Sequence, residues 1–217
     1  MVEEAISQEE AAEKFYGFMI QKMKSGTSVD EITNELVDMG VDRKIADKLV
    51  KGSYDQITKV AEEKKATSQT LLPATLGGLL AALVGGAVWA LIAEASGYEI
   101  GFMAIGMGIL SGEVVVLCAQ GKKGPPLQII AVLSSILGIL VANYIMFFNT
   151  VKELAIEEYG EEIVSLLSMF NSDLISTFFE GIGDIFSDGY GILWMILAIF
   201  TAWKIPRSVG IKSPASK

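Results

Sequence analysis

The chain has 217 residues, is 51% hydrophobic with a mean hydropathy of +0.46, and yet carries a net charge of −9. A single water-soluble domain would not have both this hydropathy and this net charge. The charged and the apolar residues must therefore belong to different parts of the chain. There is no histidine and a single cysteine, Cys118. A Ser-His-Asp triad, a histidine-bound metal, a thiolate cluster and an internal disulfide are therefore excluded. The acidic balance disfavours nucleic-acid binding.

Residues 1–65 carry 14 acidic and 10 basic side chains and are predicted to form a small helical module. Two capping boxes, Ser7–Glu10 and Ser28–Glu31, place a hydroxyl three residues before a glutamate, which is typical of helix starts. They predict helices over about 8–25 and 29–39. A third helix is expected to begin after Asp42 and to continue toward residue 60.

Residues 31–50, EITNELVDMGVDRKIADKLV, resemble the start of ubiquitin-associated-type three-helix domains. Those domains share a leucine, then Met-Gly-aromatic, and an alanine in the next helix. Leu36, Met39, Gly40 and Ala46 match, whereas Val41 replaces the aromatic residue. The resemblance implies that Leu36, Met39, Gly40 and Val41 bind a protein partner. A general protein-contact module is favoured over ubiquitin binding, and a simple cap on the apolar part remains open.

Residues 66–149 hold only five charged side chains and contain three apolar runs, about 71–93, 98–118 and 127–148. At 1.5 Å per residue, each run covers roughly the 30 Å hydrocarbon core of a bilayer. Because backbone groups in lipid must bond to one another, the runs are predicted to be membrane-spanning helices.

The charge distribution predicts the orientation of these spans. Basic residues precede the first span, occupy the link after residue 118 and fill the tail, residues 207–217. The segment 150–188 carries nine acids against one base and is predicted to be amphipathic and extracytoplasmic. With a fourth span in 189–206, the chain crosses four times and both termini are cytoplasmic. The predicted fold class is an all-α, multi-pass inner-membrane protein with a small N-terminal helical domain.

The runs GYEIGFMAIGMGILSG and LQIIAVLSSILGILVANY, joined by a Gly/Lys turn, resemble a segment that recurs in uncharacterised bacterial inner-membrane proteins. There the segment follows variable soluble N-terminal parts. The resemblance implies this topology and a bacterial origin, and it carries no assigned activity and no catalytic residue.

Small residues recur along the first two spans, and they predict close approach of helix backbones in lipid. Packing within one chain is favoured, with homo-oligomerisation as the alternative. The candidate packing residues are Gly78, Ala82, Gly86, Gly108 and Gly112.

Glu113 is the candidate functional residue inside the spans, because a carboxylate there costs roughly 2–3 kcal/mol and faces a partner or water. Folding about the turn after residue 121 is expected to bring Ser134 and Ser135 to its depth. A protonated or snorkelling Glu113 bonded to these serines is favoured over a role in ion passage. Asn143 is expected to form an interhelical hydrogen bond.

The motif Gly181–Asp184 matches the GxGD of intramembrane aspartyl proteases. That chemistry needs two carboxylates sharing a proton at bilayer depth, and the first three spans contain no aspartate. The proline-containing partner motif of those proteases is also absent. Asp184 is therefore predicted to be a polar residue at the mouth of the last span.

The leading hypothesis is a non-enzymatic accessory or anchor subunit that presents its cytoplasmic helical module to a protein partner. The alternative is a small oligomeric ion or solute channel, or a transporter, with Glu113 near the path. The scarcity of polar residues in the spans argues against a pore within one chain. The expected partners are the lipid bilayer and either another protein or further copies, with no catalytic residue, metal or cofactor.

Overall fold

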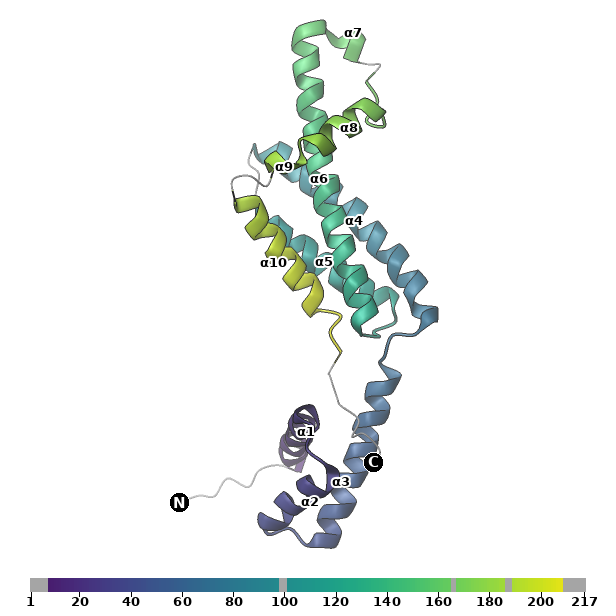
Figure 1. The fold of residues 1–217 in the computed structure, drawn as a ribbon, viewed down its shortest axis with the longest axis vertical. Helices are drawn as coiled ribbons and strands as arrows, with labels where there is room; N and C mark the ends of the chain where they lie inside the picture. Colours follow the sequence, from purple (N-terminus) through teal and green to yellow (C-terminus); the bar gives the residue numbers. More distant parts are fainter. Residues whose placement is uncertain (1–7, 98–100, 165–166, 186–188, 209–217) are drawn as a thin grey trace. The chain divides into compact units, whose positions relative to one another are not determined.

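A computed structural model describes residues 8–97, 101–164, 167–185 and 189–208, and these residues form an all-helical structure (Figure 1). The predicted all-α class is confirmed. The chain divides into two compact units, residues 1–65 with 208–217, and residues 66–207. Ser7 of the first capping box, residues 98–100 at the start of the second expected span, and residues 209–217 of the basic tail lie outside the described residues.

The N-terminal unit contains α1 (Gln8–Ser25), α2 (Val29–Asp38) and α3 (Arg43–Glu63). The capping box at the start of α2 forms as predicted. The backbone N–H of Ser28 donates to Glu31 Oε2 at 2.9 Å, and the N–H of Glu31 donates to Ser28 Oγ at 3.2 Å. The hydrogen bond from the Ser28 backbone, aided by its hydroxyl, lowers the pKa of the Glu31 carboxyl.

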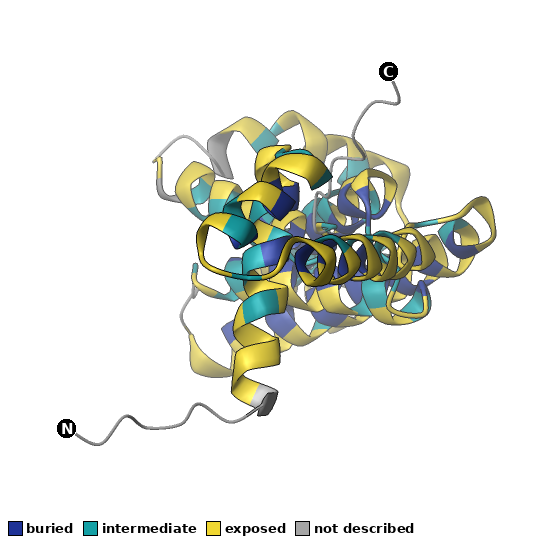
Figure 2. Ribbon diagram, turned by 90° about the horizontal axis from the view of Figure 1, so that it is seen from below, coloured by how far each residue is buried: buried dark blue, intermediate teal, exposed yellow. Residues whose placement is uncertain are grey.

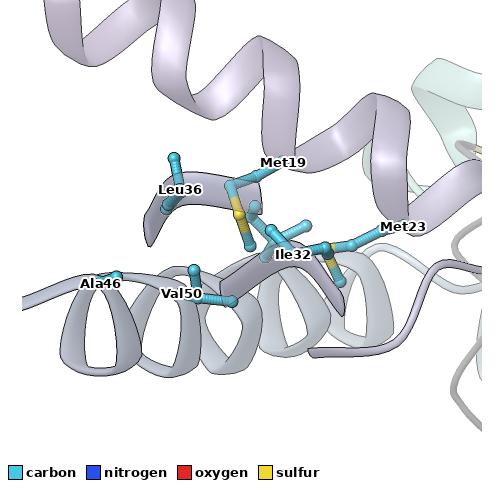
Figure 3. Close-up of a cluster of buried hydrophobic side chains, with 7 residues drawn as sticks. Met19, Met23, Ile32, Leu36, Ala46 and Val50 are labelled. Carbon is cyan, nitrogen blue, oxygen red and sulfur yellow. The ribbon is translucent and has the colours of Figure 1, made fainter. Parts of the chain in front are cut away.

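The core of this unit is a cluster of apolar side chains drawn from all three helices, shown in part in Figure 3: Met19, Met23, Ile32, Leu36, Ala46, Val50 and Ile57. Polar bonds at its edge join the helices. Lys22 of α1 pairs with Glu35 of α2 at 2.6 Å, and the Tyr16 hydroxyl donates to Gln56 of α3 at 2.9 Å. The apolar core and these bonds fix the three helices as one module.

The second unit is a helical bundle of α4 (Ser68–Ser96), α5 (Met103–Cys118), α6 (Pro125–Tyr159) and α10 (Tyr190–Lys204). Helices α5 and α6 each contact the other three. Among the described residues, α4 and α6 are long and apolar enough to cross a membrane, whereas α5 and α10 are apolar but shorter. The bundle is confirmed, and only two of the four expected spans meet this length.

Helix α6 is longer than predicted. It continues past residue 148 to Tyr159, so the expected boundary at residue 150 falls inside a helix. The added stretch, NTVKELAIEEY, contains good helix formers and no glycine or proline until Gly160, where φ is +81°. Helix α5 differs in the opposite direction, since it begins at Met103.

After α6 the chain forms α7 (Glu161–Val164), α8 (Ser172–Glu180) and α9 (Ile182–Ile185). Asn171 caps α8 by accepting a hydrogen bond from Asp173 N at 2.7 Å. Phe178 is buried where α8 meets α6, and its ring lies 5.2 Å from that of Tyr144. The middle of the expected amphipathic segment is therefore held against α6.

Candidate functional site

The core of the bundle has two apolar clusters with a layer of small residues between them. The Trp89 cluster consists of Trp89, Ala93, Ala104, Met107, Ile139, Ala142 and Ala198. The Leu127 cluster consists of Ala74, Val115, Ala119, Leu127, Ala131 and Ala202. On every helix of the bundle, the residues between the two clusters include glycine, alanine, serine or threonine. This middle layer comprises Gly77, Gly78, Ala81, Ala82, Gly85, Gly86, Gly108, Ser111, Gly112, Ser134, Ser135, Gly138 and Thr201.

Helix α4 faces two neighbours through two pairs of glycines spaced eight residues apart. A Cβ at Gly85 would meet Leu110 and Met107 of α5 at 2.8 Å, so this face of α4 packs on α5. A Cβ at Gly86 would lie 2.7 Å from the carbonyl oxygen of Gly138 in α6. Consecutive glycines therefore let the backbone of α4 approach both helices at once.

Helix α5 uses its own glycines to face α10. A Cβ at Gly108 would collide with the backbone of Ala198 and the hydroxyl of Thr201. One turn later, a Cβ at Gly112 would lie 2.8 Å from Ile205. The five candidate packing residues named from the sequence, including Gly78 and Ala82 on α4, are all buried inside this chain.

Hydroxyl groups lie in the middle layer. Ser111 of α5 and Ser135 of α6 are fully buried, and neither hydroxyl has a hydrogen-bond partner among the described residues. Gly138 packs on Met107, and Ser111 and Ser135 lie about one turn from these two residues in antiparallel helices, so they share one level of the bundle. Ser134 is also buried and faces Gly78.

Glu113 lies on the outer face of α5 and is exposed. No hydrogen bond joins its carboxylate to Ser134 or Ser135 within the described part of the chain, and both serines point into the bundle. The expected contact is absent because Glu113 lies two residues from Ser111, which is about 200° around the helix. Asn143 donates to the Ile139 carbonyl oxygen at 2.8 Å, which is a bond within α6 and not between helices.

The candidate partner-binding residues of the N-terminal unit separate into a buried and an exposed group. Leu36 belongs to the core and Val41 packs against it. Met39 is 64% exposed, and Gly40 adopts a positive φ of +96° that ends α2. Ile45 and Leu49 are also exposed, one turn apart on α3. The sequence analysis did not single out this pair, because Ile45 and Leu49 are apolar residues that directly precede the buried Ala46 and Val50.

Hydrogen bonds tie together the ends of three chain segments at one end of the bundle. The N–H of Ala66 donates to the Lys123 carbonyl at 3.0 Å, and the N–H of Gly124 donates to that of Pro206 at 2.9 Å. The buried side chain of Gln128 donates to the Trp203 carbonyl at 2.8 Å. A single glutamine in an apolar run was the available sequence signal, since a buried amide in such a run needs a partner.

This arrangement can pack helices closely, and the buried polar side chains described in the bundle are serine and threonine hydroxyls and the Gln128 amide, which carry no charge near neutral pH. Within the described ranges, no group of three or more His, Cys, Asp or Glu side chains lies close enough together to hold a metal ion. In comparisons with known proteins, no family model, no curated protein and no solved structure matches the chain.

Proposed function

We propose that the protein is a non-enzymatic accessory or anchor subunit of a bacterial inner membrane, with its N-terminal helical module available to a protein partner. The observation that carries this proposal is the reversed distribution of side-chain size in the bundle. The buried positions of α4 are almost all glycine and alanine, whereas both its valines and all its leucines except Leu71 are exposed. Figure 2 colours the ribbon by burial, and buried and exposed segments alternate along the helices.

A water-soluble bundle buries its large apolar residues because removing them from water is favourable. Lipid tails are as apolar as leucine, so a membrane bundle is stabilised by close packing of small residues instead. Helix α4 alone exposes nine large apolar residues: Leu72, Leu76, Leu79, Leu80, Leu83, Val84, Val88, Leu91 and Ile92. A patch of this size on a soluble monomer would promote aggregation.

The proposal includes four crossings. Helices α4 and α6 are roughly 43 and 52 Å long, and α5 and α10 roughly 24 and 22 Å. The shorter pair requires local thinning of the bilayer or flanking residues that reach the interface. Lys122, Lys123 and Lys204 lie near the hydrogen-bonded end of the bundle, which is therefore the proposed cytoplasmic end.

The N-terminal module supports the second half of the proposal. Met39, Ile45 and Leu49 are large apolar side chains exposed on a unit whose own core is already filled by other residues. Exposed apolar residues beside charged ones are typical of surfaces that bind proteins.

Cysteine labelling tests the orientation. In a Cys118→Ala background, Ser25→Cys places a thiol on α1 and Ser176→Cys places one on α8, and both positions are exposed. We expect a membrane-impermeant maleimide to label only Ser176→Cys on spheroplasts and to label both after lysis. The unlabelled control is the Cys118→Ala chain. Labelling of Ser25→Cys on sealed spheroplasts would contradict the orientation, and release of the protein by alkaline carbonate would contradict membrane insertion.

Glu113 favours a second candidate function, a channel built from several copies. Its carboxylate is exposed on an apolar face of α5, between Ile109 and Leu117. In lipid a carboxylate in this position needs water or a polar partner. Several copies arranged around this face would line a path with carboxylates.

Replacing Glu113 with glutamine distinguishes the two candidates. An anchor is expected to keep its membrane level and partner binding, and to give liposomes no cation flux in either form. A channel is expected to show cation flux that falls at least tenfold in Glu113→Gln, because the charged ring is lost. Cation flux through reconstituted protein is the measurement, with the exposed Glu153→Gln on α6 as the matched control.

A further inference from the structure

A hollow lies on the outer side of the bundle. It has a volume of about 460 Å³ and is open on one side. Its floor comes from α4 and α6, and its roof comes from α8 and the turn before it. The principal lining residues are Leu83, Leu137, Val141, Tyr144, Phe170 and Phe178. We refer to it as the Tyr144 groove, and its size lies in the range of small-ligand pockets.

The roof of the Tyr144 groove is fixed to its floor. The Tyr144 hydroxyl donates a hydrogen bond to the Met169 carbonyl, which satisfies the one polar side-chain group of the lining. Phe178 is buried, and its ring lies 5.2 Å from Tyr144 and 5.7 Å from Phe147. These aromatic contacts hold α8 in place, so the groove is a built feature of the fold.

The chain leaves large apolar side chains uncovered at the edge of this groove. Phe170 is 82% exposed and Phe179 is 55% exposed, although both line it. The lining offers no free polar group for water. The helices that form the floor, α4 and α6, are the two longest apolar helices in the described part of the chain. In the proposed membrane location, the material available to fill such a groove is a lipid acyl chain.

The charges beside the groove select the headgroup. Asp173 and Glu180 are exposed at the two ends of α8, where Glu180 directly follows the lining residue Phe179 and Asp173 lies three residues after the lining residue Phe170. The segment 150–188 contains nine acids and one base, Lys152. An anionic headgroup would be repelled here, whereas an ammonium group would be attracted.

We propose that the Tyr144 groove binds one acyl chain of a phospholipid whose headgroup carries an ammonium, as phosphatidylethanolamine does. This inference rests on the proposed membrane location. The groove takes the acyl chain by apolar contact, and the acids of α8 select the amine over an anionic head such as phosphatidylglycerol.

The test uses the full chain in mild detergent, incubated with phosphatidylethanolamine or phosphatidylglycerol of identical acyl chains and observed by native mass spectrometry. We expect phosphatidylethanolamine to be retained at least fivefold more than phosphatidylglycerol. Leu83→Trp fills the groove and is expected to reduce retention at least fivefold. Leu80→Trp is the matched control, because Leu80 is exposed on the same helix and lies outside the groove.

Asp173→Asn combined with Glu180→Gln is expected to make retention of the two lipids equal. If the unaltered chain retained phosphatidylethanolamine and phosphatidylglycerol equally, the headgroup assignment would be wrong. If Leu83→Trp and Leu80→Trp retained phosphatidylethanolamine equally, the groove would not be the binding site. A diazirine-bearing phosphatidylethanolamine gives an independent readout on the unaltered chain, with crosslinks expected on 137–145 and 169–179. Protein that stays in carbonate-washed membranes but retains neither lipid contradicts this inference alone, whereas protein released by carbonate contradicts the membrane location.

Discussion

Gly108→Leu is expected to destabilise the helical bundle by about 3 kcal/mol or more, because any Cβ at this position collides with the backbone of α10. The neighbouring atoms are the carbonyl group of Ala198 and the hydroxyl of Thr201. A backbone group cannot rotate away as a flexible side chain can, so the whole of α10 must move. Helix α10 is then expected to separate from α5, and the Trp89 cluster loses Ala198.

Thermal unfolding in mild detergent, followed by circular dichroism, measures this effect. A loss of 3 kcal/mol corresponds to a fall in midpoint of roughly 6–12 °C for a unit of this size. Gly106→Leu is the matched control, since it makes the same substitution two residues earlier on α5, where no atom lies within 4 Å of an added Cβ. A midpoint equally low in both variants would show that leucine disturbs α5 itself and that its contact with α10 is not the cause.

Ile32→Ala is expected to unfold the N-terminal module while the bundle stays folded. Ile32 is fully buried among side chains from all three helices of the module (Figure 3). Removing a buried isoleucine side chain costs about 2–5 kcal/mol. A core in a module this small supplies about 3–5 kcal/mol of net stability, so the loss consumes most of it.

Limited proteolysis of the full chain measures the outcome. Trypsin is expected to cleave within α1–α3 of Ile32→Ala at least tenfold faster than in the unaltered chain, and to leave the fragment after residue 66 intact. Ile45→Ala is the control, because this isoleucine is 56% exposed and its truncation removes little buried area. Unchanged cleavage of Ile32→Ala would contradict a core centred on this residue.

The local elements could be predicted where short-range chemistry decides them. Ser28 and Glu31 lie three residues apart and cap α2 whatever the rest of the chain does. Gly40 ends that helix because it can adopt a positive φ. The length of α6 was predicted less well, since hydropathy falls after residue 148 while helix propensity continues to Tyr159. Hydropathy and helix propensity are separate signals, and the predicted end of this helix was based on hydropathy alone.

The sequence predicted that helices pack closely, but it did not predict which residues are in contact. The pattern of small residues indicated close packing but did not identify the neighbour of each glycine. Gly108 packs on Ala198, which lies 90 positions later in the sequence. Glu113 was assigned to the serines by depth alone, although its position around α5 turns it outward. The depth of a residue in a span follows from counting residues along the helix. The direction in which its side chain points depends on how the helix packs against all of its neighbours.

The glycine face of α5 has a consequence for biosynthesis. Helix α10 leaves the ribosome roughly 70 residues after α5 ends, which takes about 4–14 s at 5–20 residues per second. During that interval Gly108 and Gly112 lack the partner that fills the space beside them. A nascent chain stopped before residue 190 therefore leaves the glycine face of α5 uncovered, and other helices being inserted nearby can pack against it. Insertion of α10 fills the space beside Gly108 and Gly112, so α5 is protected from pairing with other helices only from that point.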